Sequence, residues 1–300
     1  MDLQNLQTAY ENLDVYASQV VEGFITGMHK SPFHGFSVEF AEHRIYNTGE
    51  STKHIDWKLF GRTDKLFVKR FEEETNLRCH LLLDVSESMY YPASTALKFK
   101  YAAVVAAVLA NVLKRQRDAF SLTCFADQIV WQSELKSSAS NYQSILHELS
   151  RRMQSHEPLS GSRIADALNQ MAERIQRRSL VVIISDMFES DKQSDALFKA
   201  LQHLRFKKHE VLIFNINDAQ TENRFEFENR PYQFIDAETK ASVKLFPDQV
   251  KALYLEQIQA YRKVIYDKCH QYKIDFNDID IQAPLQQILL PFFKKRQSMH

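Results

Sequence analysis

Residues 79–89 read CHLLLDVSESM, and this stretch decides the fold. The apolar run at residues 81–83 shows no polar alternation, which is typical of a strand buried on both faces of a parallel sheet. Asp84 closes the run. From residue 97 to residue 112, apolar side chains recur every three or four positions, which predicts a helix that covers the sheet. The stretch therefore predicts the first strand, loop and helix of an α/β protein.

The rest of the chain alternates between strands and helices in the same way. The predicted strands are residues 118–125, 128–132, 180–184, 211–216 and 274–276, and the predicted helices are residues 142–153, 164–175, 195–204 and 250–269. Residues 218–244 are polar and are expected to be irregular. This order predicts an α/β fold class with a doubly wound, mostly parallel, Rossmann-like sheet and right-handed crossovers.

Two regions are expected along the chain. Residues 1–78 are predicted to form an N-terminal helical and β elaboration, because residues 1–28 have helical spacing and the aromatic stretches at 36–40 and 66–71 alternate as strands do. Residues 79–300 are predicted to form the α/β domain, which includes the C-terminal helix and the final strand.

Composition argues against several classes of protein. Lys plus Arg and Asp plus Glu both total 38, so the net charge attracts neither nucleic acid nor an anionic membrane. Cys79, Cys124 and Cys269 lie far apart in apolar surroundings, which fits reduced thiols. The N-terminus lacks the pattern of a signal peptide, and no apolar run reaches the ~20 residues that a spanning helix needs. We therefore expect a cytoplasmic protein without membrane insertion.

Common catalytic motifs are missing from the sequence. Its six glycines form neither a phosphate-binding loop nor a G-x-G-x-x-G pattern. No H-E-x-x-H, C-x-x-C or G-x-S-x-G occurs. The signatures of nucleotide-binding loops, zinc proteases, dithiol redox proteins and serine hydrolases are therefore absent.

The D-x-S-x-S of Asp84, Ser86 and Ser88 remains, at the sheet edge where open α/β folds bind ligands. One carboxylate and two hydroxyls are hard oxygen donors that suit Mg²⁺ or Mn²⁺. A six-coordinate ion needs more donors, and the two candidates are Ser162, which opens a helix, and Asp186, which ends the second buried strand. The alternative is that Ser86 or Ser88 caps the next helix and that both aspartates are ordinary strand-end residues.

At these residues the chain resembles the von Willebrand factor type A superfamily, in which D-x-S-x-S opens the metal-ion-dependent adhesion site (MIDAS). The resemblance implies that Ser86, Ser88 and Ser162 bind the cation directly, Ser162 standing where the family usually has threonine. It implies that Asp84 and Asp186 act mainly through coordinated waters. Such a site is a binding device, because an Asp or Glu of a partner protein fills the open position on the cation.

A second resemblance precedes this motif. The stretch HRIYNTGESTKHIDWKLFGRTDKLFVKRFEEETN is similar to the signature of the bacterial domain-of-unknown-function family fifty-eight, and the similarity continues through LLLDVSESM, KFKYAA, LVVIISDMF and HEVLIFNI. The chain departs from the pattern with Glu50 for Asp, Lys53 for Arg, Ser162 for Thr, and Arg163 where an acidic residue is frequent. Family members are often encoded near MoxR-type AAA+ ATPases, which implies such an ATPase, or its client, as the partner.

The family signature has two readings. In one, Arg44, Asp56, Trp57 and Arg62 form a docking surface for the ATPase or its client, and Arg163 adds a positive charge near the cation site. In the other, the aromatic side chains pack this segment onto the sheet and the charged side chains form internal ion pairs.

Together these observations predict a non-catalytic protein-interaction module that presents Mg²⁺ or Mn²⁺ to a partner's carboxylate. The enzyme alternative is a Mg²⁺-dependent phosphohydrolase of the haloacid-dehalogenase type, which also places an aspartate after an apolar strand. That chemistry needs a second carboxylate two positions after the nucleophile, and this chain has Ser86 there. Nucleic-acid binding is disfavoured because the basic pairs have acidic neighbours.

Overall fold

The chain forms two compact units, which are described separately. The computed structural model describes residues 12–28, 43–45, 57–63, 66–69, 77–155, 164–176, 178–188, 191–236 and 240–297. The larger unit contains residues 1–24 and 77–300, and the smaller unit contains residues 25–76.

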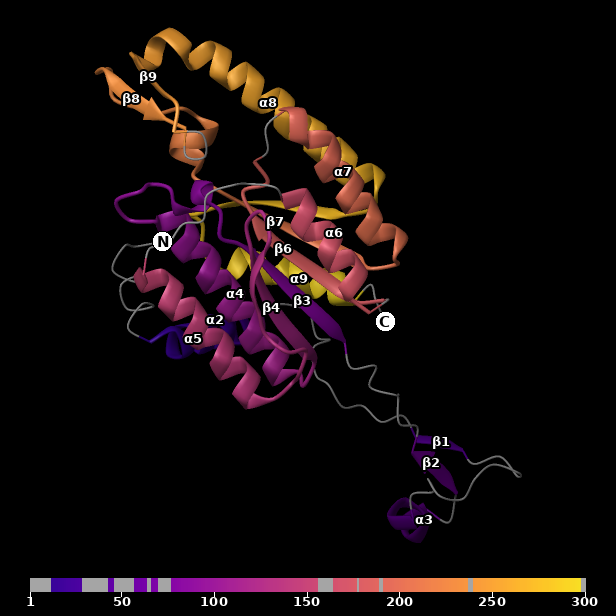
Figure 1. The fold of residues 1–300 in the computed structure, drawn as a ribbon. Helices are drawn as coiled ribbons and strands as arrows, with labels where there is room; N and C mark the ends of the chain where they lie inside the picture. The colour runs from indigo at the N-terminus through magenta and orange to yellow at the C-terminus, as the bar shows by residue number, and fades with distance from the viewer. Residues whose placement is uncertain are drawn as a thin grey trace. The chain divides into compact units, whose positions relative to one another are not determined.

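A six-stranded sheet forms the centre of the larger unit (Figure 1). Its strands are β3 (Arg78–Asp84), β4 (Ala119–Phe125), β5 (Ile129–Gln132), β6 (Leu180–Ser185), β7 (Glu210–Asn217) and β10 (Asp275–Asp280). They lie in the order β10-β7-β6-β3-β4-β5, and every neighbouring pair is parallel except β4 with β5. The predicted fold class, an α/β protein with a doubly wound and mostly parallel sheet, is confirmed.

The position of β3 in the middle of the sheet explains its apolar run of three leucines. Leu81, Leu82 and Leu83 are fully buried. Successive side chains of a strand point to opposite faces of the sheet. Leu81 and Leu83 accordingly join the hydrophobic cluster on one face, and Leu82 joins the cluster on the other. A strand that is covered on both faces has no exposed side on which polar residues could alternate.

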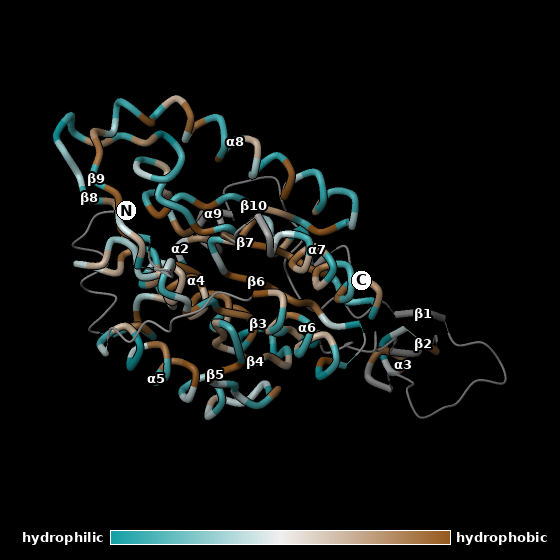
Figure 2. The backbone as a smooth tube through the Cα atoms, turned by 45° about the horizontal axis from the view of Figure 1, so that its top comes forward, coloured by the Kyte–Doolittle hydropathy of each residue, from teal (hydrophilic) through white to brown (hydrophobic). Residues whose placement is uncertain are grey.

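Helices cover both faces of the sheet. The hydrophobic cluster around Leu81 includes side chains of α2 (Leu13–Met28), α4 (Leu97–Arg115), α5 (Ala139–Ser155) and α9 (Gln286–Gln297). The cluster around Leu82 includes side chains of α6 (Ile164–Arg174), α7 (Asp191–Phe206) and α8 (Pro247–Gln271). Figure 2 shows hydrophobic strands at the centre and a largely hydrophilic α8 outside them. In α4, residues 101–110 are all buried, which is typical of a helix that is covered on every side.

Helix α2 belongs to the larger unit as far as Phe24, although we expected the first 78 residues to form one region. Ala17 is fully buried in the cluster around Leu81. The Tyr142 hydroxyl donates a hydrogen bond to Asp14 at 2.8 Å, and the ring of Phe24 stacks on Phe293 with centroids 5.5 Å apart. These contacts join α2 to α5 and α9, so the separate unit is only the segment from residue 25 to residue 76.

The described residues of the smaller unit form the last turn of α2, two short strands and one further helix. β1 (His43–Ile45) pairs in antiparallel fashion with β2 (Phe67–Lys69), and α3 (Trp57–Thr63) lies between them in the sequence. The predicted strand at residues 66–71 contains β2. The predicted strand at residues 36–40 lies outside the described residues.

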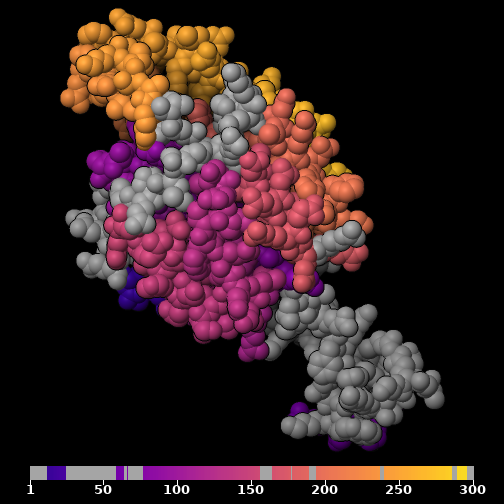
Figure 3. Space-filling view, viewed as in Figure 1, coloured from indigo at the N-terminus to yellow at the C-terminus, as the bar shows by residue number. Residues whose placement is uncertain are grey.

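A β-hairpin follows β7 in the region that we expected to be irregular, so that expectation is wrong. A π-helical turn, η3 (Ala219–Asn223), leads into β8 (Tyr232–Ile235), which pairs with antiparallel β9 (Ser242–Leu245). The ring of Phe225 lies 4.5 Å from the ring of Tyr254 on α8, measured between centroids. Figure 3 shows this hairpin and α8 as an orange part of the surface.

A buried histidine lies on β3. His80 is 6% exposed, and its Nδ1 lies 2.8 Å from the Ser121 hydroxyl, while its Nε2 has no hydrogen-bond partner among the residues that the structure describes. Burial, followed by the electrostatic effects of His209 and Arg78, lowers the pKa of His80 to about 4. The folded protein therefore holds this imidazole neutral.

We expect the buried His80 to make the folded state less stable in acid. The unfolded chain binds a proton near pH 6.5, but the folded chain does so only near pH 4. As the pH falls through this window, the unfolding free energy of the wild type should fall relative to that of His80→Gln, by on the order of 3 kcal/mol. Urea unfolding at several pH values measures this difference, with His147→Gln at an exposed position as the matched control. A difference that stays constant between pH 7 and pH 4 would contradict the expectation.

Candidate metal centre

The candidate metal centre lies where the strand order of the sheet reverses. β3 has β4, the next strand in the sequence, on one side and the later strand β6 on the other. Parallel strands end at the same edge of a sheet, so the last residue of β3, Asp84, and the first residue after β6, Asp186, lie at one edge. Open α/β sheets bind ligands at such switch points.

Asp84 is a buried carboxylate whose two oxygens both accept hydrogen bonds. Its Oδ1 accepts from the backbone N–H of Ser86 at 2.8 Å, and its Oδ2 accepts from the hydroxyl of Ser185 at 2.6 Å. The residue is 0% exposed and forms no ion pair with a cationic side chain of the described residues. Burial and the nearby charge of Asp186 raise the pKa of Asp84 to about 6, against the effect of these hydrogen bonds. At neutral pH this edge therefore carries a buried negative charge.

The two serines of the motif place their hydroxyls side by side. Ser86 Oγ lies 3.1 Å from Ser88 Oγ. Ser86 precedes a short 3-10 helix, η2 (Glu87–Tyr90), but its side chain makes no capping hydrogen bond, and α4 is preceded by Ala96. The alternative in which Ser86 serves as a helix cap is therefore not supported.

The spacing of the hydroxyls fits a small divalent cation. Mg²⁺ binds oxygen at about 2.1 Å in octahedral geometry, which puts neighbouring ligands about 3.0 Å apart. The separation of 3.1 Å between Ser86 Oγ and Ser88 Oγ matches this edge. Asp84 already accepts two hydrogen bonds, so its carboxylate suits contact through a water molecule better than direct coordination. The donor set is all oxygen, which suits Mg²⁺ or Mn²⁺ and is poor for zinc.

Asp186 forms an ion pair with a lysine that sequence reasoning missed. Lys98 Nζ lies 2.9 Å from Asp186 Oδ2 and 2.6 Å from Glu222 Oε1. The side chain of Lys98 is only 1% exposed. Burial by itself would lower the pKa of Lys98, but the charges of Asp186 and Glu222 outweigh this effect and raise it. Lys98 is therefore a buried ammonium ion that is shared by two carboxylates.

A signal for Lys98 was present in the sequence, whereas Glu222 gave none. A lysine on the first turn of a helix that otherwise buries nearly all its residues calls for a buried anionic partner. Glu222 lies on η3, in the segment that we expected to be irregular, so nothing in the sequence placed it near the end of β6.

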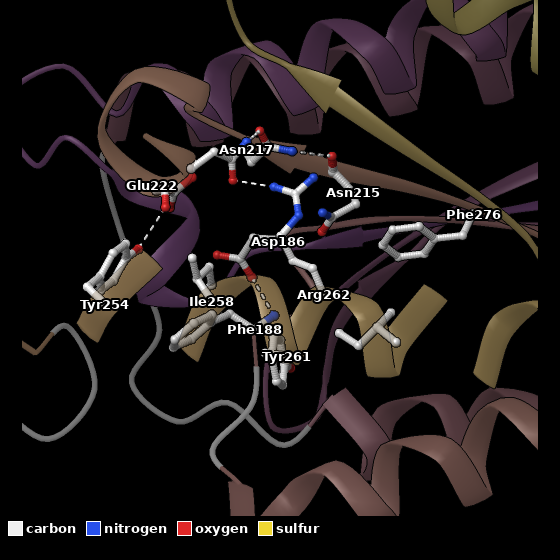
Figure 4. A pocket seen from close by; sticks show the side chains of 12 residues that line it. Asp186, Phe188, Asn215, Asn217, Glu222, Tyr254, Ile258, Tyr261, Arg262 and Phe276 are labelled. Atoms are coloured by element: carbon white, nitrogen blue, oxygen red, sulfur yellow. Dashed lines mark hydrogen bonds between the residues drawn. The ribbon is translucent and has the colours of Figure 1, made fainter. Parts of the chain in front are cut away.

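A small cavity lies beside this cluster, between the end of the sheet and α8 (Figure 4). Its volume is about 60 Å³, which is room for a few water molecules. Asp186, Glu222 and Asn215 line its polar side, and Tyr254 and Tyr261 of α8 line the other. Their polar atoms offer hydrogen bonds to water inside the cavity.

The remaining predicted site residues are distributed as follows. Ser162, Arg163 and Asp56 lie outside the described residues. Arg44 lies on β1 and Trp57 begins α3, but the structure describes neither side chain. Arg62 is exposed on the last turn of α3. Of the metal-site prediction, the structure brings together Asp84, Ser86, Ser88 and Asp186.

Solved structures with a similar chain trace include two proteins from Bacteroides. The conserved hypothetical protein BatB from Bacteroides thetaiotaomicron has 13% identity and a TM-score of 0.45, over 74% of this chain and 99% of that one. An aerotolerance-related membrane protein from Bacteroides fragilis has 14% identity and a TM-score of 0.44, over 73% and 99%. A von Willebrand factor type A structure from Catenulispora acidiphila has 16% identity and a TM-score of 0.36, over 48% and 34%.

The expectation of a cytoplasmic protein is contradicted by these comparisons, and we withdraw it. The similar structure from Bacteroides fragilis is described as a membrane protein. Among the helices that the structure describes, none has both the length and the apolar character needed to cross a bilayer.

Sequence comparison gives the family. An uncharacterised protein of Mycobacterium tuberculosis strain H37Rv is 22% identical over 220 residues, which cover 73% of this chain and 68% of that protein. The family described as "Protein of unknown function DUF58" matches residues 42–263. This match covers the family signature, the D-x-S-x-S motif and most of the sheet, and the chain therefore belongs to the DUF58 family.

Proposed function

We propose that this protein is a non-catalytic protein-interaction module that presents Mg²⁺ or Mn²⁺ at the end of β3 to a carboxylate of a partner protein. The observation that carries the proposal is the buried carboxylate of Asp84, which has no cationic side chain beside it among the described residues. A buried charge needs a counter-charge. A divalent cation on the neighbouring serine hydroxyls would supply it.

Four described residues would hold the ion. Ser86 and Ser88 would bind it directly through their hydroxyls, which have the spacing of two octahedral neighbours. Asp84 and Asp186 would act through coordinated waters, because each carboxylate already has other partners. The bound ion would offer an open position to an Asp or Glu of the partner. Burial of that single charged contact would strengthen it.

The phosphohydrolase alternative receives no support from the geometry. Asp84 is fully buried and both of its oxygens accept hydrogen bonds, so the carboxylate is not presented as a nucleophile. The position two residues later is Ser86, whose hydroxyl cannot serve as a carboxylic general acid. A binding role uses the same residues and requires neither an exposed nucleophile nor a general acid.

Metal binding should depend on the charge of Asp84. Asp84→Asn keeps the shape of the side chain but removes its charge, so we expect the affinity for Mn²⁺ to fall at least tenfold. Calorimetric titration of the two proteins measures this, and Asp127→Asn at an exposed position is the matched control. Equal Mn²⁺ affinity in Asp84→Asn and the wild type would remove Asp84 from the site.

Partner binding should in turn depend on the metal. The resemblance of the sequence to its family suggests a MoxR-type AAA+ ATPase, or a client of it, as the partner. We expect association with such an ATPase in Mg²⁺, and its loss both in EDTA and in Asp84→Asn, as measured by analytical ultracentrifugation.

An association that is unchanged in EDTA and in Asp84→Asn would move the contact to another surface. The family signature is the first alternative, and Arg62→Ala, at an exposed position of α3, tests it.

A further inference from the structure

Lys98 joins three segments of the chain that are far apart in the sequence. It lies on α4, while Asp186 follows β6 and Glu222 belongs to η3. Nζ of Lys98 donates a hydrogen bond to each carboxylate, at 2.9 Å and 2.6 Å. Burial of a lysine costs free energy unless its charge is paired. Here the charge is paired twice.

The position of Glu222 is fixed independently of Lys98. Its Oε2 accepts a hydrogen bond from the backbone N–H of Asp218 at 2.7 Å. Its main-chain oxygen accepts another from the hydroxyl of Tyr254 on α8 at 2.9 Å. Contacts with η3 and α8 therefore hold Glu222 in the position in which its carboxylate pairs with Lys98.

Taken together, the carboxylates of Asp84, Asp186 and Glu222 and the ammonium of Lys98 carry a net charge of minus two, and the nearby Arg262 is paired with Asp278. A divalent cation would neutralise that charge. If Lys98 had Asp186 as its sole partner, it would cancel the negative charge that the metal needs. Because Lys98 is also paired with Glu222, it neutralises only part of the charge of Asp186, and the rest remains available to attract a cation.

We propose that Lys98 and Glu222 together set the charge that the metal centre presents, with Lys98 weakening and Glu222 strengthening the binding of a divalent cation. Neither residue touches the ion in this arrangement. Both act through Asp186, so they are positioning residues that tune its affinity. The inference rests on the proposed function of the same site.

A charge cycle of three variants tests the proposal. Lys98→Met removes one positive charge and Glu222→Gln removes one negative charge, while the double variant restores the original net charge. We expect Lys98→Met to bind Mn²⁺ about tenfold more tightly than the wild type and Glu222→Gln about tenfold more weakly. The double variant should return to the wild-type affinity. Calorimetry gives the affinities, and the Mn²⁺-induced rise in melting temperature gives a second readout.

Matched controls remove the same charges elsewhere. Lys114→Met lies on the same helix but near its other end, and Glu228→Gln lies beyond η3 on an exposed side chain. Both should leave the Mn²⁺ affinity within about twofold of the wild type, since Lys114 lies at the far end of α4 from the site and the exposed charge of Glu228 is screened by solvent.

The opposite signs of the two single variants separate charge tuning from a purely structural role. If Lys98 and Glu222 only hold the fold together, both single variants bind Mn²⁺ more weakly, and that result overturns the inference while leaving the metal site in place. If no protein of the series, the wild type included, binds Mn²⁺, the proposed function itself fails.

Loss of Lys98 leaves the largely buried carboxylate of Asp186 without its cation and can prevent folding. In that event the Mn²⁺ affinity of Glu222→Gln is compared with that of the wild type, because this substitution changes the packing least. Weaker Mn²⁺ binding by Glu222→Gln, with unchanged circular dichroism and an unchanged melting temperature without metal, supports the proposal. Equal or tighter binding overturns it.

Discussion

A carboxylate buried at the end of the central strand constrains the edge of the sheet around it. Asp84 is fully inaccessible to solvent, and the chain surrounds it with hydrogen-bond donors from Ser86 and Ser185. Donors of this kind stabilise a buried charge but do not neutralise it. At the end of the neighbouring strand β6, Asp186 receives its counter-charge from Lys98. The two aspartates therefore differ in one respect that matters for function: Asp186 has a cation from the protein, and Asp84 has none among the described residues.

The fold brings these charges together through its topology. In a parallel sheet, the carboxyl ends of the strands lie at one edge. The strand order reverses at β3, because β4 and β5 lie on one side of it and β6, β7 and β10 lie on the other. The helix after β3, α4, starts at the same edge and brings Lys98 with it. The β7 strand ends there too and continues into η3, which carries Glu222. Burial on both faces keeps the sheet rigid, so side chains at its edge are held at fixed spacings.

The parts of this picture that depend on periodicity could be predicted from the sequence. The apolar run of β3 and the helical spacing of α4 are local patterns, and they gave the sheet, the covering helix and the place of the D-x-S-x-S motif. The β8–β9 hairpin and the Lys98 cluster depend on contacts between distant segments. No periodic pattern in the sequence indicates that the rings of Phe225 and Tyr254 meet. Glu222 lies in a polar stretch whose sequence is typical of a loop. The expected N-terminal region of residues 1–78 wrongly included α2 for the same reason, because the stacking of Phe24 on Phe293 joins opposite ends of the chain.

The central claim is that the hydroxyls of Ser86 and Ser88 bind a divalent cation beside Asp84. The most direct measurement is anomalous X-ray scattering from crystals grown at saturating Mn²⁺, which locates the ion without assumption about its ligands. We expect one strong anomalous peak within about 2.2 Å of both hydroxyl oxygens, with water between the ion and Asp84. Well-ordered density for Ser86 and Ser88 with no anomalous peak between them at saturating Mn²⁺ would contradict the account.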